Sequence, residues 1–135
     1  MRTAAALVVL LCAAGCSNEA ATPLTTTHNV GRWSLQLDRS FQRHDDGAVV
    51  SFTAARYRVI AKKLCDARPP NVAPVIYKKN GVRAEVYYLA HETVACLHNG
   101  NDTLALTMKY GDDEGGRRWA DAVWQSAQFR RQLTP

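Results

Sequence analysis

Histidine and carboxylate side chains are the usual metal ligands and proton carriers of proteins, and this 135-residue chain contains four histidines. They stand far apart, at His28, His44, His91 and His98, without the His-x-His or His-Glu-x-x-His spacing of a zinc site. Glu92 follows His91, but consecutive residues of a strand point to opposite faces. The histidines therefore predict no metal centre and are expected at exposed turns and strand edges.

Carboxylates and serines do not form a recognisable catalytic set. The acidic runs 45–46 and 112–114 offer oxygen ligands for Ca²⁺, but the EF-hand spacing is absent and the second run suits the start of a helix. Nothing selects Glu85 and Glu92 as the paired carboxylates of a hydrolase. Neither a Gly-x-Ser-x-Gly turn nor a Gly-x-Gly-x-x-Gly or Walker loop is present. The sequence predicts a protein that is not an enzyme and that needs no cofactor or metal.

The N-terminal residues have the composition of an export signal. Arg2 precedes an apolar run from Ala4 to Ala14, which is as long as the core of a secretory signal and shorter than the ~20 residues of a membrane-spanning helix. The run leads into Ala-Ala-Gly-Cys at residues 13–16, which resembles the bacterial lipobox, although alanine stands where leucine is usual. The resemblance implies cleavage of a signal peptide, residues 1–15, and a lipid on Cys16. An ordinary secretory signal cut nearby and an uncleaved anchor are the alternatives.

The same resemblance implies where the protein resides. Several acyl chains on one cysteine anchor a protein stably, whereas a single chain is marginal. Ser17 rather than aspartate follows Cys16. In Gram-negative lipoproteins this implies the inner leaflet of the outer membrane, facing the periplasm, and the inner membrane stays open. No nucleic-acid partner is expected in the periplasm. Residues 16–30 are small, polar and aperiodic, so we expect a flexible tether before a single domain at residues 31–135.

Export of the protein would change how many cysteines are available to pair with each other. Cleavage leaves 135 − 15 = 120 residues and removes Cys12, one of the four cysteines. With Cys16 lipidated, only Cys65 and Cys96 remain, without a Cys-x-x-Cys spacing. In an oxidising compartment this pair is expected to form a structural disulfide, which the loop-entropy relation values at about 3.5 kcal/mol. A redox-active or metal-binding pair is the alternative.

Tyrosine and basic residues gather in one segment of the chain. Tyr77, Arg83, Tyr87 and Tyr88 lie within twelve positions, next to two lysines. Tyrosine and arginine are enriched at the centres of protein interfaces, so these four residues are predicted to form a protein-binding surface. The net charge of +5 has two interpretations. It is either an ordinary solvated surface or a surface for an anionic partner, such as an acidic protein, lipid headgroups or a cell-wall polymer.

An antiparallel sheet is expected to position these residues. The composition, 47% apolar and 21% charged, is typical of a globular domain. Apolar and polar residues alternate along 33–38, as in a half-buried strand. Asn80-Gly81 separates the runs 74–79 and 82–88, and Asn99-Gly100-Asn101 separates 93–97 from 103–108; both are hairpin signals. About seven strands are predicted, most of them antiparallel and joined by hairpins.

The C-terminal part has a different periodicity. Apolar residues with helical spacing, including Trp119, Val123 and Trp124, predict an amphipathic helix over residues 117–132. Two tryptophans on one face would dock this helix onto the sheet. The predicted fold class is therefore α+β, with an antiparallel sheet of about seven strands and a C-terminal helix packed on it.

Three segments carry a resemblance to a known family. The runs 33–41 and 45–52 and the terminal Trp-Ala-Asp-Ala-Val-Trp segment are similar to those of small PsbP-like bacterial lipoproteins, and their layout resembles periplasmic immunity lipoproteins of type VI secretion. The resemblance spans most of residues 33–129 through short motifs, and no functional residue carries over. It implies an antiparallel sheet flanked by helices, and protein binding without catalysis.

These observations predict a periplasmic lipoprotein that binds and inhibits another protein. The most specific form is an immunity protein that neutralises a type VI secretion toxin or a cell-wall hydrolase. An accessory lipoprotein of an envelope or secretion complex is the first alternative, and a small envelope hydrolase or metal-dependent enzyme is the second. The oligomeric state does not follow from the sequence.

Overall fold

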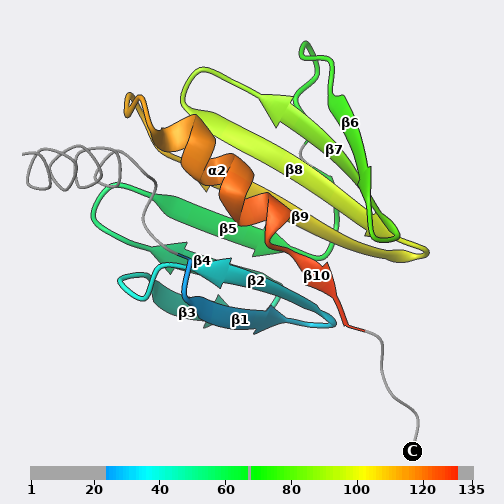
Figure 1. Ribbon diagram of the computed structural model, residues 1–135, viewed down its shortest axis with the longest axis horizontal. Helices are drawn as coiled ribbons and strands as arrows, with labels where there is room; N and C mark the ends of the chain where they lie inside the picture. The colour runs from blue at the N-terminus through cyan, green and yellow to red at the C-terminus, as the bar shows by residue number, and fades with distance from the viewer. Residues whose placement is uncertain (1–23, 67, 131–135) are drawn as a thin grey trace, which may run out of the picture.

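The computed structural model describes residues 24–66 and 68–130, which form two antiparallel sheets and one α-helix (Figure 1). Sheet B has seven strands in the order β3-β4-β5-β9-β8-β7-β6, and sheet A has three in the order β1-β2-β10. The elements are β1 (Thr26–Val30), β2 (Trp33–Leu37), β3 (Gln42–Asp46), β4 (Val49–Thr53), β5 (Arg58–Lys62), β6 (Val75–Lys79), β7 (Val82–Tyr88), β8 (Glu92–Asn99), β9 (Asp102–Lys109), α2 (Gly116–Gln125) and β10 (Gln128–Phe129). The predicted signal peptide and its neighbour Cys16 lie outside the described residues.

Sheet B grows by hairpins, as the turn signals predict. Asn80 and Gly81 both have positive φ, 52° and 79°, and this turn joins β6 to β7 in the register Lys79 opposite Val82. Gly100, with φ 61°, joins β8 to β9. A two-residue turn with positive φ twists in the same sense as its strands, so asparagine followed by glycine is favoured there. Both predicted hairpins are confirmed.

The fold class is confirmed only in part. A mostly antiparallel sheet with a helix on its C-terminal side is present, but the described residues form ten strands and one helix, so the architecture is largely β. The run at 33–37 is a strand as predicted, yet it belongs to the separate sheet A. Alternation reveals a half-buried strand, but it does not reveal which sheet the strand joins.

The predicted helix at residues 117–132 is too long. Helix α2 ends at Gln125, and Ser126 then binds β2 because its Oγ accepts a hydrogen bond from the Gln36 backbone N–H at 2.9 Å. Gln128 and Phe129 follow as β10, paired with β2. The edge of β2 supplies backbone partners from 90 positions earlier in the chain. The apolar periodicity of a short segment carries no information about backbone partners that are so distant in the sequence.

The predicted tether at residues 16–30 is also too long. Its last five residues form β1, which pairs with β2 along its whole length from Thr26 opposite Leu37 to Val30 opposite Trp33. Val30 is buried, and the His28 ring packs on Phe52 with 4.8 Å between ring centroids. The folded part therefore begins before the predicted boundary at residue 31. Pairing with β2 gives this polar segment a structure that its own composition does not indicate.

The hydrophobic core lies between sheet B and a second layer made of α2 and sheet A. Figure 1 shows α2 lying across the middle strands of sheet B. Trp119 is the largest fully buried side chain, and it stacks between Tyr57 and Phe41 with centroid distances of 4.1 and 5.8 Å. Asp113, from the acidic run expected at the helix start, instead accepts a hydrogen bond from the Tyr57 hydroxyl. One face of sheet B is thereby covered, and the other is its open face.

The loop between β5 and β6 is fixed to this open face. Cys65 in the loop forms the predicted disulfide with Cys96 on β8, with 5.8 Å between their Cα atoms. No helix in the described ranges is both long and apolar enough to cross a membrane.

Candidate functional site

The four residues predicted to bind protein all lie at the β6–β7 end of sheet B, but on two different faces. Tyr77 is opposite the buried Ala84 in the register, and Tyr88 lies four positions after Ala84 on β7. Both tyrosines therefore point toward α2. Arg83 and Tyr87 alternate with them and point to the open face. The four residues thus lie at one end of the sheet, and the pleat divides them between its two faces.

On the α2 face, the hairpin is tied to the helix by a chain of hydrogen bonds through Asp121. Its Oδ1 accepts from the Tyr88 hydroxyl at 2.8 Å and from the Trp124 indole N–H at 2.9 Å. The Tyr77 and Tyr88 hydroxyls are 3.2 Å apart, and the Tyr77 ring lies 5.0 Å from that of Trp124. Burial, together with the hydrogen bonds to Tyr77 and Asp121, raises the pKa of Tyr88. Arg117 also stacks on the Tyr88 ring at 4.0 Å.

A groove of about 270 Å³ opens beside this contact, between the β6–β7 hairpin and the α2–β10 segment. We call it the hairpin groove; its main lining residues are Tyr77, Lys79, Val82, Leu97, Trp124 and Phe129. Its volume is just below the ~300–1,000 Å³ of sites for small-molecule ligands, so it suits a single side chain better than a cofactor. The groove does not follow from the sequence, because residues 125–129, which form one wall, have the apolar spacing of a continuous helix.

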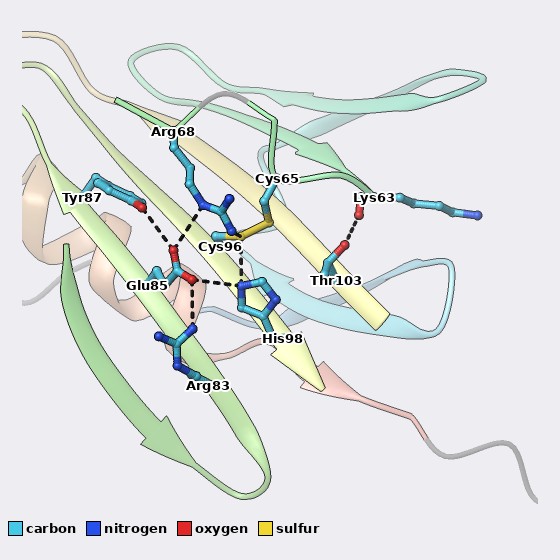
Figure 2. Close-up of a disulfide and its surroundings, with 9 residues drawn as sticks. All are labelled: Lys63, Cys65, Arg68, Arg83, Glu85, Tyr87, Cys96, His98 and Thr103. Carbon is cyan, nitrogen blue, oxygen red and sulfur yellow. Dashed lines mark hydrogen bonds and ion pairs between the residues drawn. A yellow bond between two sulfur atoms is a disulfide. The ribbon is translucent and has the colours of Figure 1, made fainter. Parts of the chain in front are cut away.

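On the open face, Glu85 is the centre of a charged cluster (Figure 2). Its Oε1 accepts a hydrogen bond from Arg83 at 2.9 Å and lies 3.3 Å from Nε2 of His98. Its Oε2 accepts hydrogen bonds from Nε of Arg68 at 3.2 Å and from the Tyr87 hydroxyl at 3.1 Å. The Glu85 side chain is only 13% exposed. Each carboxylate oxygen thus has two partners, which come from three separate segments of the chain.

These contacts set the protonation of the cluster. Burial by itself would raise the pKa of Glu85, but the hydrogen bonds from Arg83 and Tyr87 and the charges of Arg68 and His98 outweigh burial and lower it. Burial and the carboxylate of Glu85 raise the pKa of Tyr87. Tyr87 is 4% exposed, so its predicted role as a surface anchor is wrong in this structure. It supports Glu85 from within, while Arg83 keeps about half of its side chain exposed.

The disulfide borders the same cluster. Sγ of Cys96 lies 3.3 Å from Nε2 of His98 and 3.8 Å from a terminal nitrogen of Arg68. Donor atoms of Cys65, Cys96 and His98 lie within 4.8 Å of one another, which is a spacing that metal sites use. A metal requires thiolates, whereas these two sulfurs are bonded to each other. In this state the arrangement fixes the β5–β6 loop to β7 and β8, as Figure 2 shows.

The outer edge of the hairpin carries three consecutive exposed apolar residues. All five residues of β6 are exposed, and they include Val75 at 43%, Ile76 at 43% and Tyr77 at 37%. Lys78 and Lys79 complete the strand. Tyr77 is one of the residues predicted to bind protein, whereas its apolar neighbours Val75 and Ile76 are not. A continuous apolar run is typical of a buried strand, so position at the edge could not be inferred from it.

Comparison with known protein families gives no match to this chain, and comparison with curated proteins gives none either. The likeness to PsbP-like and immunity lipoproteins therefore stays a prediction. The functional conclusion depends on the chemistry of the β6–β7 hairpin.

Proposed function

We propose that this protein is a non-enzymatic binding protein of the periplasm, anchored to the inner leaflet of the outer membrane through a lipid on Cys16, and that it inhibits another protein. In its most specific form it is an immunity protein that neutralises a toxin delivered by type VI secretion, or a cell-wall hydrolase. The export signal and the lipobox resemblance support the address. The β6–β7 hairpin supports the binding role.

The exposed apolar edge of β6 is the observation that carries the proposal. Val75, Ile76 and Tyr77 account for three of the four large hydrophobic residues that are exposed in the described chain. They are contiguous, and they lie on an outermost strand whose backbone has no partner on its far side among the described residues. Val75 and Tyr77 point to the α2 face and Ile76 to the open face, so the apolar surface follows the edge of the strand. Exposed apolar surface beyond scattered single residues marks interaction sites in soluble proteins. Two lysines and Arg83 border it, as in interfaces with an apolar centre and a polar rim.

The charged cluster on the open face supports the proposal indirectly, because it holds the β6–β7 hairpin in place. Glu85 accepts hydrogen bonds from Arg68, Arg83 and Tyr87. It also lies against His98, so the hydrogen-bonding capacity of its carboxylate is used within the protein. Such a network, together with the disulfide, holds the hairpin in one geometry. A pre-ordered surface loses less conformational entropy on binding, which favours tight inhibition.

Competition between bacterial strains tests this function. A strain that lacks the gene should be killed when it grows in contact with wild-type neighbours, and the wild-type gene should restore its survival. The variant Ile76→Glu, which places a charge in the apolar edge, should fail to protect. The matched variant His44→Glu, on the opposite outer strand β3, should protect as well as the wild type. Wild-type protein levels for both variants, measured by immunoblot, complete the comparison.

Equal survival of the deletion strain beside wild-type neighbours would contradict the immunity function. If the protein then co-purified in fixed stoichiometry with a multi-protein envelope assembly, the accessory role would be favoured instead. Protection that survives Ile76→Glu would place the binding surface elsewhere on the molecule.

A further inference from the structure

The outer edge of β6 has the properties of a strand that accepts another strand. It is the last strand of sheet B, and among the described residues only β7 pairs with it. Alternate backbone N–H and C=O groups of an edge strand point away from the sheet and are available to a second chain. Natural edges are commonly protected by charges or proline along their length. In β6 only the last two residues, Lys78 and Lys79, are charged.

We propose that β6 binds an extended acidic segment of the partner protein, which joins sheet B as an eighth strand and places one apolar side chain in the hairpin groove. This inference rests on the proposed binding function and specifies its mode. Main-chain hydrogen bonds to an edge provide affinity in such complexes, and pockets for alternate side chains provide specificity.

The groove lies where an added strand could use it. Tyr77 and Lys79 are on β6 and also line the hairpin groove, so the groove opens on the α2 face of the edge strand. Every second side chain of a strand added to β6 would point to that same face. A residue opposite Tyr77 would then extend toward the apolar wall formed by Trp124 and Phe129. The groove volume of about 270 Å³ accommodates one large apolar side chain.

The charges of the hairpin determine which segment fits. Residues 75–88 carry three cations, Lys78, Lys79 and Arg83, and one carboxylate, Glu85, so the excess is 3 − 1 = +2. Glu85 is already bound to Arg83 and Arg68 and so cannot neutralise the two lysines. Opposite charges on neighbouring strands stabilise their pairing, and like charges destabilise it. The favoured partner segment is therefore acidic opposite the lysines and apolar opposite Val75 to Tyr77.

Designed peptides test this mode with the full-length protein. Fluorescein-labelled probes carry Glu-Glu-Leu-Val-Val, or the reverse order for parallel pairing, between threonine flanks. One of the two should bind in a fluorescence anisotropy titration, and hydrogen exchange should slow at residues 75–79 and not in β3. Two further probes are N-methylated at alternate peptide residues, one at the first set of positions and the other at the complementary set. Strand pairing uses one edge of the peptide, so one methylated probe should lose binding and the other should retain it.

Charge-exchange variants test the specificity. Lys78→Glu combined with Lys79→Glu should weaken binding of the glutamate probe roughly tenfold, since two favourable cross-strand pairs become repulsive. The same variant should gain affinity for a probe with lysine in place of glutamate. Lys63→Glu, which changes an exposed lysine in the β5–β6 loop, is the control and should leave both affinities unchanged.

Several outcomes would overturn the proposal. The first is the absence of binding by either probe at about 1 mM. The second is equal binding by both methylated probes, and the third is slowed hydrogen exchange in β3. If residues 75–79 became protected with rising protein concentration and no peptide, the edge would serve a second copy of this chain. Each of these results would leave the competition assay unaffected, so a failed strand-addition mode is distinguishable from a failed inhibitory function.

Discussion

The two outer strands of sheet B are equally exposed and chemically opposite. β3 and β6 each contain five residues, all exposed, and each pairs on one side only within the described chain. β3 reads Gln-Arg-His-Asp-Asp, and β6 reads Val-Ile-Tyr-Lys-Lys. Charged side chains along an edge discourage pairing with other chains, so β3 is protected by its own sequence. The apolar half of β6 lacks that protection, and exposure alone would not have distinguished the two edges.

The support beneath the two edges also differs. Tyr77 of β6 packs on Trp124 of the helix, and the loop leading into β6 is bonded to β8 through Cys65. On β3, Arg43 pairs with Asp45 of its own strand at 3.0 Å and lies over the Phe52 ring at 5.7 Å. β6 is thus held by distant parts of the chain, whereas β3 is held mainly by its neighbour β4. We expect perturbations of that distant support to affect β6 and to leave β3 unchanged.

Removal of the disulfide should have the largest effect. The double variant Cys65→Ser, Cys96→Ser should lose about 3.5 kcal/mol of unfolding free energy, because the open loop gains entropy in the unfolded chain. Hydrogen exchange should accelerate in β6 and not in β3. Urea denaturation and amide exchange measure the two effects, and reduction of the wild-type protein with a dithiol is the control. Equal acceleration of hydrogen exchange in β3 and β6 would contradict the conclusion that distant contacts hold β6 and not β3.

Truncation of Trp124 should have the next largest effect. Trp124→Ala should cost about 3 kcal/mol, at the low end for tryptophan, because this side chain lines a groove and already has space on one side. The variant should also release Tyr77 and so weaken peptide binding at β6. Trp124→Phe, which keeps an aromatic ring against Tyr77, should recover most of both losses. Denaturant unfolding and the peptide titration check this, and full stability of the alanine variant would contradict it.

Glu85 should make stability depend on pH. Its folded-state pKa lies below the ordinary value of 4.5, so the ionised carboxylate stabilises the fold above that value, and the stabilisation is lost as pH falls through the lowered pKa. Glu85→Gln should cost about 1.5 kcal/mol at neutral pH, through weaker hydrogen bonds to arginine. Its stability should vary less with pH below 4.5 than that of the wild type. Urea unfolding across that window measures the difference, and parallel pH profiles would contradict it.

The ion pair on β3 should contribute least. Asp45→Ala should change the unfolding free energy by less than about 0.5 kcal/mol, because the Asp45 side chain is 61% exposed and water screens its charge from that of Arg43. Peptide binding at β6 should be unaffected. Thermal and urea unfolding of this variant beside Glu85→Gln compare an isolated exposed pair with a buried network. A loss as large as that of Glu85→Gln would contradict this expectation. It would mean that the charges of β3 stabilise the fold as well as discourage pairing with other chains.

Much of sheet B could be predicted because its signals are local. Asn80-Gly81 specifies a hairpin through two positive φ angles, and alternation along β7 specifies which side chains share a face of the sheet. The end of α2 could not be predicted, since Ser126 and β10 respond to β2. Nor could the cluster around Glu85, which assembles residues from β7, β8 and the β5–β6 loop. In this cluster the only local signal is the spacing of Arg83, Glu85 and Tyr87 at every second position of one strand.

The sequence by itself determined the hairpins, the cysteine pair, the apolar face of the helix and the end of the sheet where tyrosine and basic residues gather. These features depend on φ preferences, on side-chain periodicity and on composition within a few residues. Only the tertiary structure decided that β6 is an edge, that Tyr87 is buried and that the hairpin groove exists. Strand order and burial depend on contacts between distant segments, and the hydrophobic effect favours burial without specifying which strand is outermost.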